Sequence, residues 1–335
     1  MMTRWAVFIA LTRLAVAQAG GDAASLVRDV STAAMSATSW RAEGSVVRRG
    51  ADGRVQAPVR FRIAFQPPRY ARLEISGADA TLLRICDGGA QRTYYPDLKG
   101  FVRVALPQIG PCAFPINAWP PLAATLARPT LAGTDTLRVE GRPTACQIVR
   151  SPFTWAGRDP AVKETVTLWI DRTQHRILRY QMEHSAPGPA TSETYTFSSL
   201  EMNAELKASA FDFEAPAGSH AFATIDWLSP ISGLAEGVAQ VSDAVSAPVL
   251  TKVMPPVAPP EAAMVEGGNT VALHVQIGID GVVEAVEVSR SLGPGMDEAA
   301  VAAVKHWRFT PGMSVSGPVT VAGTVLVHFM DPVRK

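Results

Sequence analysis

The sequence has almost no net charge, few aromatic residues and few long apolar runs. Among its 335 residues, 31 Lys and Arg face 30 Asp and Glu, which leaves a formal net charge of +1. Nucleic-acid binding depends on clustered cations, so this balance argues against a DNA- or RNA-binding protein. Charged residues make up 18% of the chain and interrupt its apolar stretches, which excludes a polytopic membrane protein. Hydrophobic residues, at 47%, still suffice for a globular core.

Motifs for catalysis and metal binding are missing as well. The six histidines form no HxH or HxxxH pair, and none lies near a cysteine. We therefore expect no metal site and no cofactor. No GxSxG motif or glycine-rich phosphate loop follows a predicted strand, and nothing places a base beside a nucleophile. We expect that the protein is not an enzyme; an unrecognised hydrolase is the remaining alternative.

The N-terminus has the pattern of an export signal. Arg4 supplies a positive charge, residues 5–17 are mostly apolar, and Ala17-Gln18-Ala19 fits a small-x-small cleavage site. A membrane-spanning helix needs about 20 apolar residues, whereas this run is shorter and contains Arg13. We expect cleavage after residue 19 and a periplasmic mature protein. The alternative is a retained signal that anchors the chain in the inner membrane.

The mature chain would contain three cysteines, Cys86, Cys112 and Cys146. In an oxidising compartment we expect one disulfide and one buried thiol. Cys112 and Cys146 bracket a Pro-rich loop and are the favoured pair, but the sequence does not determine which pair forms.

Residues 20–227 are predicted to form a first domain. Apolar positions at helical spacing predict a helix over 22–35, and from residue 40 the apolar period changes to two. Short alternating runs, separated by Gly, Asp and Pro turns, then predict about ten antiparallel strands, the last at 211–213. Prolines between 107 and 121 predict a break in this sheet.

The motifs of this region resemble the LolA-like superfamily of periplasmic lipoprotein carriers over about residues 24–222. The resemblance rests on Pro67-Pro68-Arg69-Tyr70, Cys86-Asp87-Gly88, Tyr94-Tyr95-Pro96, Leu168-Trp169-Ile170-Asp171, Tyr195-Thr196-Phe197 and Phe211-Asp212-Phe213-Glu214-Ala215-Pro216-Ala217-Gly218. It implies an incomplete antiparallel β-barrel with helices, whose hydrophobic cavity shelters a lipid or lipoprotein acyl chain. The candidate cavity residues are Phe61, Ile63, Phe65, Leu73, Leu83, Leu168 and Ile170. Arg41 is a candidate contact for a lipid headgroup. The alternative is that these apolar residues fill a closed core.

A second, smaller domain is predicted over 261–331, after a linker at 228–260. The linker combines an amphipathic helix over 233–245 with five prolines between 248 and 260, which predict a semi-rigid tether. Beyond it, an alternating run over 271–279, the turn Asp280-Gly281 and valines to 288 predict a hairpin. A helix opening at Met296-Asp297 and a closing strand complete the order ββαβ. The whole chain is thus predicted to be α+β.

This C-terminal pattern strongly resembles the TonB C-terminal domain over about 248–329. The residues that carry the resemblance are Asp280, Gly281, Asp297, Ala300, Trp307, Arg308, Phe309 and Pro311. It implies a two-layer α/β fold that binds a peptide of an outer-membrane transporter as an added strand. The resemblance places the binding edge on the last strand, at Val319, Val321, Val325, Val327 and Phe329.

Together these patterns predict a periplasmic, non-enzymatic binding protein with two kinds of partner. One is a lipid or lipoprotein acyl chain, and the other is an outer-membrane TonB-dependent transporter or another envelope protein. An energy transducer with an uncleaved anchor is one alternative, although a folded domain stands where its long spacer should be. A structural adaptor that carries no ligand is the other.

Overall fold

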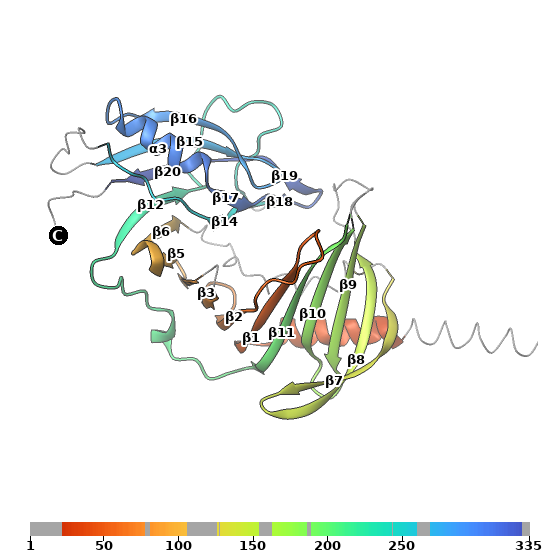
Figure 1. The fold of residues 1–335 in the computed structure, drawn as a ribbon. Coiled ribbons are helices and arrows are strands. Elements are labelled where there is room, and N and C mark those ends of the chain that lie inside the picture. Colours follow the sequence, from red (N-terminus) through yellow and green to blue (C-terminus); the bar gives the residue numbers. More distant parts are fainter. Residues whose placement is uncertain are drawn as a thin grey trace, which may run out of the picture. The chain divides into compact units, whose positions relative to one another are not determined.

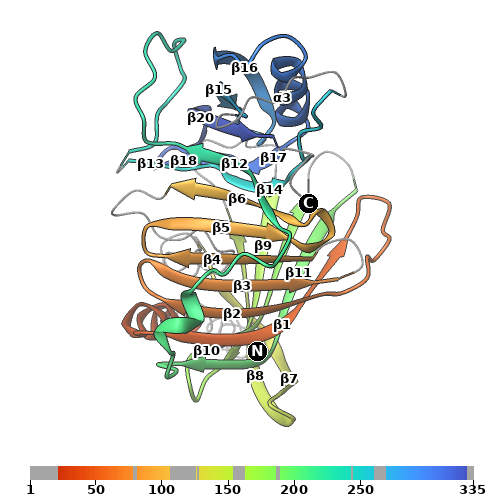
Figure 2. The same ribbon diagram turned by 90° about the vertical axis from the view of Figure 1, so that its left-hand side faces the viewer.

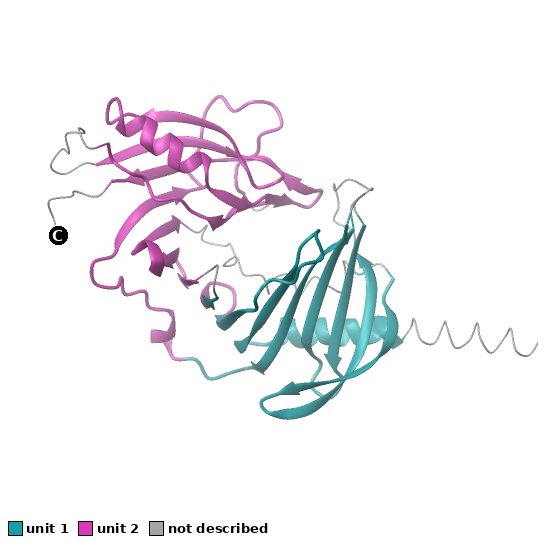
Figure 3. Cartoon of the chain, viewed as in Figure 1, with its two compact units in different colours: residues 1–65, 75–80, 114–206 teal, residues 66–74, 81–113, 207–335 magenta. Residues whose placement is uncertain are grey.

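The computed structural model describes residues 22–77, 81–105, 126, 128–153, 163–185, 189–242, 244–259 and 269–329. The predicted signal peptide, the Pro-rich loop at 107–121 and Cys112 lie outside these residues. The chain divides into two compact units (Figure 3). Unit 1 comprises 1–65, 75–80 and 114–206, and unit 2 comprises 66–74, 81–113 and 207–335. This division differs from the predicted domains, because unit 2 takes residues from the first domain, the linker and the second domain.

Unit 1 contains a helical segment and seven strands that neighbour one another in an open sheet. The helical segment covers residues 22–36 and runs across the strands (Figure 1). The sheet order is β2-β1-β11-β10-β9-β8-β7, and every neighbouring pair is antiparallel. The strands are β1 (Trp40–Arg49), β2 (Val59–Gln66), β7 (Thr130–Val139), β8 (Arg142–Phe153), β9 (Lys163–Asp171), β10 (Arg176–Ser185) and β11 (Thr191–Met202).

The helical segment forms because its apolar residues recur three and four positions apart, so that one stripe is buried. Leu26, Val27 and Val30 are each at most 6% exposed. Asp22 lies 4.0 Å from Arg172 in the β9–β10 turn. The amide of Thr38 donates to Asn203 Oδ1 just after β11 (2.9 Å). The segment therefore crosses the sheet at the end where β1 and β10 begin.

Unit 2 contains the helix α3 (Met296–Lys305) and a run of strands in the order β16-β15-β20-β12-β6-β5-β4-β3 (Figure 2). These strands are β3 (Tyr70–Ser76), β4 (Thr81–Asp87), β5 (Ala90–Tyr95), β6 (Gly100–Ala105), β12 (His220–Asp226), β15 (Thr270–Ile277), β16 (Val283–Arg290) and β20 (Val321–His328). β12, which is not among the strands predicted from the sequence, pairs with β6 in parallel. The order β15, β16, α3, β20 confirms the predicted ββαβ pattern.

Two small sheets accompany this run. β14 (Val249–Lys252) pairs with β17 (Arg308–Thr310), and β13 (Val245–Ser246) pairs with β18 (Gly312–Ser314), which pairs with β19 (Gly317–Val319). The predicted linker is therefore folded in part. Leu250 is 3% exposed, and its carbonyl accepts a hydrogen bond from Nη2 of the buried Arg84 in β4 (3.0 Å).

Other local predictions are wrong in informative ways. The predicted strand at 211–213 is not a strand: Phe211 ends a 3₁₀ turn at Ala208–Phe211, and the two residues after it are irregular. The described residues of the predicted helix over 233–245 are not helical, and Gly233 and Gly237 have positive φ angles of 72° and 84°. Such angles belong to the left-handed region and interrupt a right-handed helix.

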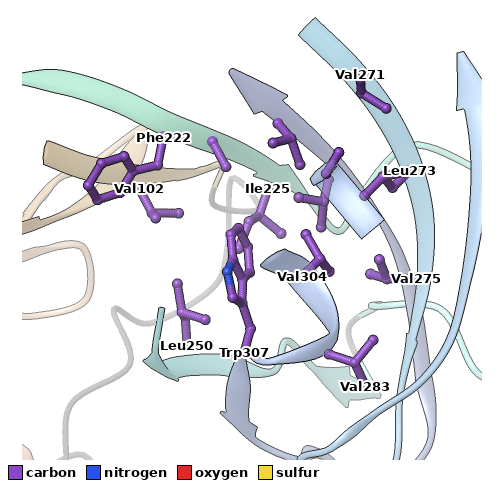
Figure 4. Close-up of a cluster of buried hydrophobic side chains, with 14 of the residues drawn as sticks. Val102, Phe222, Ile225, Leu250, Val271, Leu273, Val275, Val283, Val304 and Trp307 are labelled. Atoms are coloured by element: carbon purple, nitrogen blue, oxygen red, sulfur yellow. The ribbon is translucent and has the colours of Figure 1, made fainter. Parts of the chain in front are cut away.

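One hydrophobic core joins the strands of unit 2 on both sides of β12. Figure 4 shows Trp307 at its centre, with Val304, Ile225 and Leu250 around the ring. Val102 and Phe222, from β6 and β12, belong to the same cluster as the residues of β15 and α3. The ββαβ element therefore shares its core with strands that precede the predicted linker.

None of the helices in the described part of the chain is long and apolar enough to cross a membrane.

Candidate functional site

The predicted partner-binding edge is not an edge in this structure. β20 pairs with β15 on one side and with β12 on the other, both antiparallel. Ala223 to Asp226 lie opposite Thr324 to Val327. The placement of a free binding edge on the last strand is therefore wrong, because a strand of the chain itself already occupies it. Val319 lies in β19, and Val321, Val325, Val327 and Phe329 are buried.

β12 is held firmly in this position. Phe222, Ile225 and Trp227 are each at most 1% exposed, and burial of each such side chain contributes about 1.5–3 kcal/mol. Gly323 in β20 makes room for the Trp227 ring, since a Cβ there would lie 2.1 Å from Trp227 Cε3. Displacing β12 would expose all three side chains. The terminal strand at this end of the run is β16, on which Glu284 and Glu287 are exposed.

The residues that carry the TonB-like resemblance build the fold. Asp280 Oδ1 accepts from the amide of Val282 (2.9 Å) in the β15–β16 turn. Gly281 has a φ of 79°, and its carbonyl accepts from the amide of Phe309 (2.9 Å). A Cβ at Gly281 would lie 1.8 Å from the carbonyl oxygen of Phe309. Only glycine therefore fits where the turn meets β17.

The remaining motif residues shape α3 and the segment after it. Asp297 Oδ1 accepts from the amide of Leu292 (2.9 Å) and fixes the approach to the helix. Ala300 is fully buried, and Trp307 is too, with its Nε1 donating to the carbonyl of Met254 (2.8 Å). Arg308 is exposed, and Pro311 is half-buried. None of these contacts reaches outside unit 2.

In unit 1, the strand register gathers predicted cavity residues on one face of the sheet. Residues directly opposite in antiparallel strands lie on the same face, and side chains alternate along each strand. This apolar face carries Phe61, Ile63 and Phe65 from β2, Ala42 and Val46 from β1, Tyr195 and Phe197 from β11, Tyr180 and Met182 from β10, and Val166, Leu168 and Ile170 from β9. Five of the seven predicted cavity residues therefore belong to it, whereas Leu73 and Leu83 belong to unit 2.

Most of these residues are tightly packed. Leu168 and Ile170 are at most 1% exposed, and Phe61 and Ile63 are 6% and 7% exposed. Leu73 is also buried, whereas Phe65 and Leu83 are half-buried. Little of the surface of these predicted cavity residues is accessible to water, as in a filled core.

Arg41 lies on the opposite face of the sheet. It alternates with Trp40 and Ala42 of the apolar face, so its side chain points away from Phe61. Its guanidinium lies 3.5 Å from Glu201 and donates to the carbonyl of Glu205 (3.0 Å). Arg41 is therefore not placed to contact the headgroup of a ligand on the apolar face.

Arg48, which the sequence did not single out, is the arginine of the apolar face. It lies at the end of β1, opposite Glu193 at the start of β11, and its Nε is 2.6 Å from Glu193 Oε1. The hydroxyl of Tyr195 donates to Glu193 Oε2 (3.2 Å). We call Arg48, Glu193, Tyr195, Tyr180 and Phe61 the rim cluster. Arg48 is two residues from Val46, so the sequence indicates that both lie on the same face. Only the register of β1 with β11 identifies Glu193 as its partner.

Aromatic rings connect this ion pair to the apolar face. The ring of Tyr195 lies 6.1 Å from that of Tyr180 and 6.4 Å from that of Phe61, centroid to centroid. Burial raises the pKa of both Tyr180 and Tyr195, so both hydroxyls stay protonated at neutral pH. Burial lowers the pKa of Arg48, but the hydrogen bond and charge of Glu193 outweigh it and the net shift is upward.

The favoured disulfide between Cys112 and Cys146 is wrong for this structure, because Cys146 is a free, buried thiol. Cys112 lies outside the described residues. Burial raises the pKa of the Cys146 thiol, which keeps it protonated and unreactive.

Comparison with known proteins supports the C-terminal part of this description. Residues 255–330 match the family model of the Gram-negative bacterial TonB protein C-terminal. The C-terminal resemblance is confirmed. No curated protein matches the chain.

Several solved structures are similar in fold. A LolA superfamily protein from Nitrosomonas europaea is 12% identical, with 57% of this chain and 97% of that chain covered and a TM-score of 0.28. A putative outer membrane lipoprotein-sorting protein domain from Vibrio parahaemolyticus is 13% identical, with 58% and 97% covered and a TM-score of 0.28. The complex of Pseudomonas aeruginosa MucA and MucB is 15% identical, with 92% and 94% covered and a TM-score of 0.34. These likenesses concern the fold alone.

Proposed function

We propose that the protein is a non-enzymatic binding protein of the periplasm. Unit 1 holds a lipid or lipoprotein acyl chain against its apolar face, and unit 2 contacts an outer-membrane transporter or another envelope protein. The match of residues 255–330 to the TonB C-terminal family supports an envelope location. The apolar face of neighbouring strands supports the lipid, since each buried CH₂ group contributes about 0.8 kcal/mol.

The observation that supports a binding protein over an energy transducer is the pairing of β12 with both β6 and β20. A transducer must carry force through a tether to a module that moves freely. Here the ββαβ element continues a sheet and shares a core with strands from the N-terminal part of the chain. The module is therefore an integral part of unit 2, which suits a binding protein.

Because β12 occupies the edge of the last strand, β20, we expect a partner that binds by strand addition to pair with β16. Main-chain groups on the outer side of a terminal strand are available for such pairing. Three charged residues of this strand are exposed, Glu284, Glu287 and Arg290, and the excess of one negative charge favours a partner segment that carries basic residues.

A ligand-free adaptor is the second candidate, and the packing of Leu168, Ile170, Phe61 and Ile63 favours it. Native mass spectrometry of the protein purified from a periplasmic extract separates the two. A chain that lacks residues 1–19 and carries a lipid-sized added mass supports the lipid-binding protein. A cleaved but empty chain supports the adaptor. A full-length chain recovered only with detergent would overturn both in favour of an anchored protein.

A further inference from the structure

The rim cluster offers a positive and a negative group side by side next to aromatic rings. Arg48 and Glu193 lie 2.6 Å apart at the end of the sheet opposite to the helical segment 22–36. Their side chains are 47% and 37% exposed, so a ligand can reach both. An ion pair this exposed is worth at most about 1 kcal/mol, and opening it to admit a ligand therefore costs little.

The aromatic residues next to the Arg48–Glu193 pair extend from this exposed end into the buried apolar face. Tyr195 hydrogen-bonds to Glu193 through its hydroxyl, while its ring faces those of Tyr180 and Phe61. Phe61 in turn contacts the fully buried Phe197, at a centroid distance of 5.4 Å. One end of this cluster is thus charged and wet, and the other is apolar and dry.

The charges of the pair restrict the headgroup that fits. A purely anionic headgroup would bind Arg48 but would be repelled by Glu193, and a headgroup without charged groups would form no ion pair with either residue. A headgroup that carries a phosphate and an ammonium group can pair with both at once. We propose that the rim cluster binds the phosphoethanolamine headgroup of a phospholipid, with Arg48 contacting the phosphate and Glu193 the ammonium. This inference rests on the proposed binding of a lipid by unit 1.

The chain supplies a matched control for this pair. Arg41 and Glu201 also face each other across β1 and β11, at 3.5 Å and 52% side-chain exposure each. They lie on the opposite face of the same two strands. Variants at the two pairs thus make the same chemical change on different faces.

The test measures the affinity of the delipidated mature chain for three ligands with the same acyl chain. These are 1-palmitoyl lysophosphatidylethanolamine, 1-palmitoyl lysophosphatidylglycerol and palmitate. We expect the ethanolamine lipid to bind about fivefold more tightly than the glycerol lipid, the factor that corresponds to about 1 kcal/mol for an exposed pair. Glu193→Gln should remove this preference, and Arg48→Gln should weaken the binding of both phospholipids, because each phosphate then loses its cationic partner.

The control variants Arg41→Gln and Glu201→Gln should bind all three ligands as the unmodified chain does. Free O-phosphoethanolamine should not compete, because the apolar face supplies most of the affinity; its competition at equal concentration would overturn a lipid as the ligand. Equal binding of the three lipids, unchanged by Arg48→Gln and Glu193→Gln, would overturn the headgroup site and leave lipid binding intact. Binding of none of them would overturn lipid binding by unit 1 and the headgroup site with it.

Discussion

Gly44 lets β1 and β11 come together beneath the apolar face. A Cβ at this position would lie 2.2 Å from the carbonyl oxygen of Thr196 and 2.6 Å from Cζ of Phe61. The first of these atoms is backbone and cannot turn aside. We therefore expect Gly44→Ala to lower the free energy of unfolding of unit 1 by about 1–3 kcal/mol, the usual cost of overpacking. Thermal unfolding followed by circular dichroism measures this as a loss of several degrees.

Gly89→Ala is the matched control, since the nearest atom to a Cβ there is Asp87 Oδ1 at 3.8 Å and its φ is not in the left-handed region. It should melt close to the unmodified protein. Equal melting of the two variants would mean that β1 and β11 do not approach each other at Gly44.

Cysteine chemistry gives a second prediction for single residues. With Cys146 free and buried, the remaining pair for the expected disulfide is Cys86 and Cys112. We expect N-ethylmaleimide to leave the native protein unmodified and to add once in guanidinium without reductant. After reduction it should add three times, as intact-protein mass spectrometry would show. Two or more additions without reductant would contradict the disulfide, and none in guanidinium would contradict a free Cys146.

The side-chain contacts of single residues were the hardest features to predict from the sequence. Alternation along a strand separates Arg41 from Arg48: Arg41 is next to Trp40 and points to the other face, whereas Arg48 is two residues from Val46 and shares its face. It does not say which arginine meets a carboxylate beside aromatic rings. That depends on the pairing of β1 with β11, almost 150 residues further along the chain, and on the bulge between Glu43 and Gly44.

Among the elements, β20 offers the sharpest test. Proline at Val325 would block strand addition at a free edge, yet Val325 is fully buried between β12 and β15. Proline removes an amide donor and does not fit a central strand. We expect Val325→Pro to unfold unit 2, seen as a large loss of melting temperature. Val288→Pro in the terminal strand β16 should cost clearly less.

Hydrogen exchange of the unmodified protein tests the same arrangement without a substitution. Amides of β12 and β20 should exchange slowly, and those of β16 that point away from β15 should exchange fast. Fast exchange throughout β12 would contradict its place beside β20 and would restore the last strand as a free edge.

Elements with a local signal were predicted well. The helical segment at 22–36 and α3 follow from apolar spacing, and the β15–β16 hairpin follows from alternation around Asp280-Gly281. β12 was missed because its place depends on β6 and β20, each about 100 residues or more away in the chain. The predicted helix over 233–245 fails for the opposite reason. Its apolar spacing is helical, but Gly233 and Gly237 take left-handed turns that spacing alone does not reveal.

At the scale of the whole molecule, the question is whether the C-terminal part is tethered to the chain or built into it. A cut in the predicted linker distinguishes the two. A Cβ at Gly233 or Gly237 would meet nothing within 4 Å, so the turns there have room for an inserted protease site. Placed after Gly233, the cut leaves β12 on the N-terminal fragment and β13, β14 and the ββαβ element on the other.

We expect the two fragments to remain together on native size exclusion after cleavage and to separate only in denaturant. The pairing of β12 with β20, the hydrogen bond from Arg84 to Leu250 and the shared core around Trp307 all cross the cut. An uncut sample that carries the same insertion is the control for any effect of the insertion itself. Fragments that separate under native conditions would mean that the C-terminal module is tethered, and this result would favour the energy transducer over the binding protein. Fragments that stay together would mean that the C-terminal module is packed into unit 2 and is not held by a flexible tether, which favours the binding protein over the energy transducer.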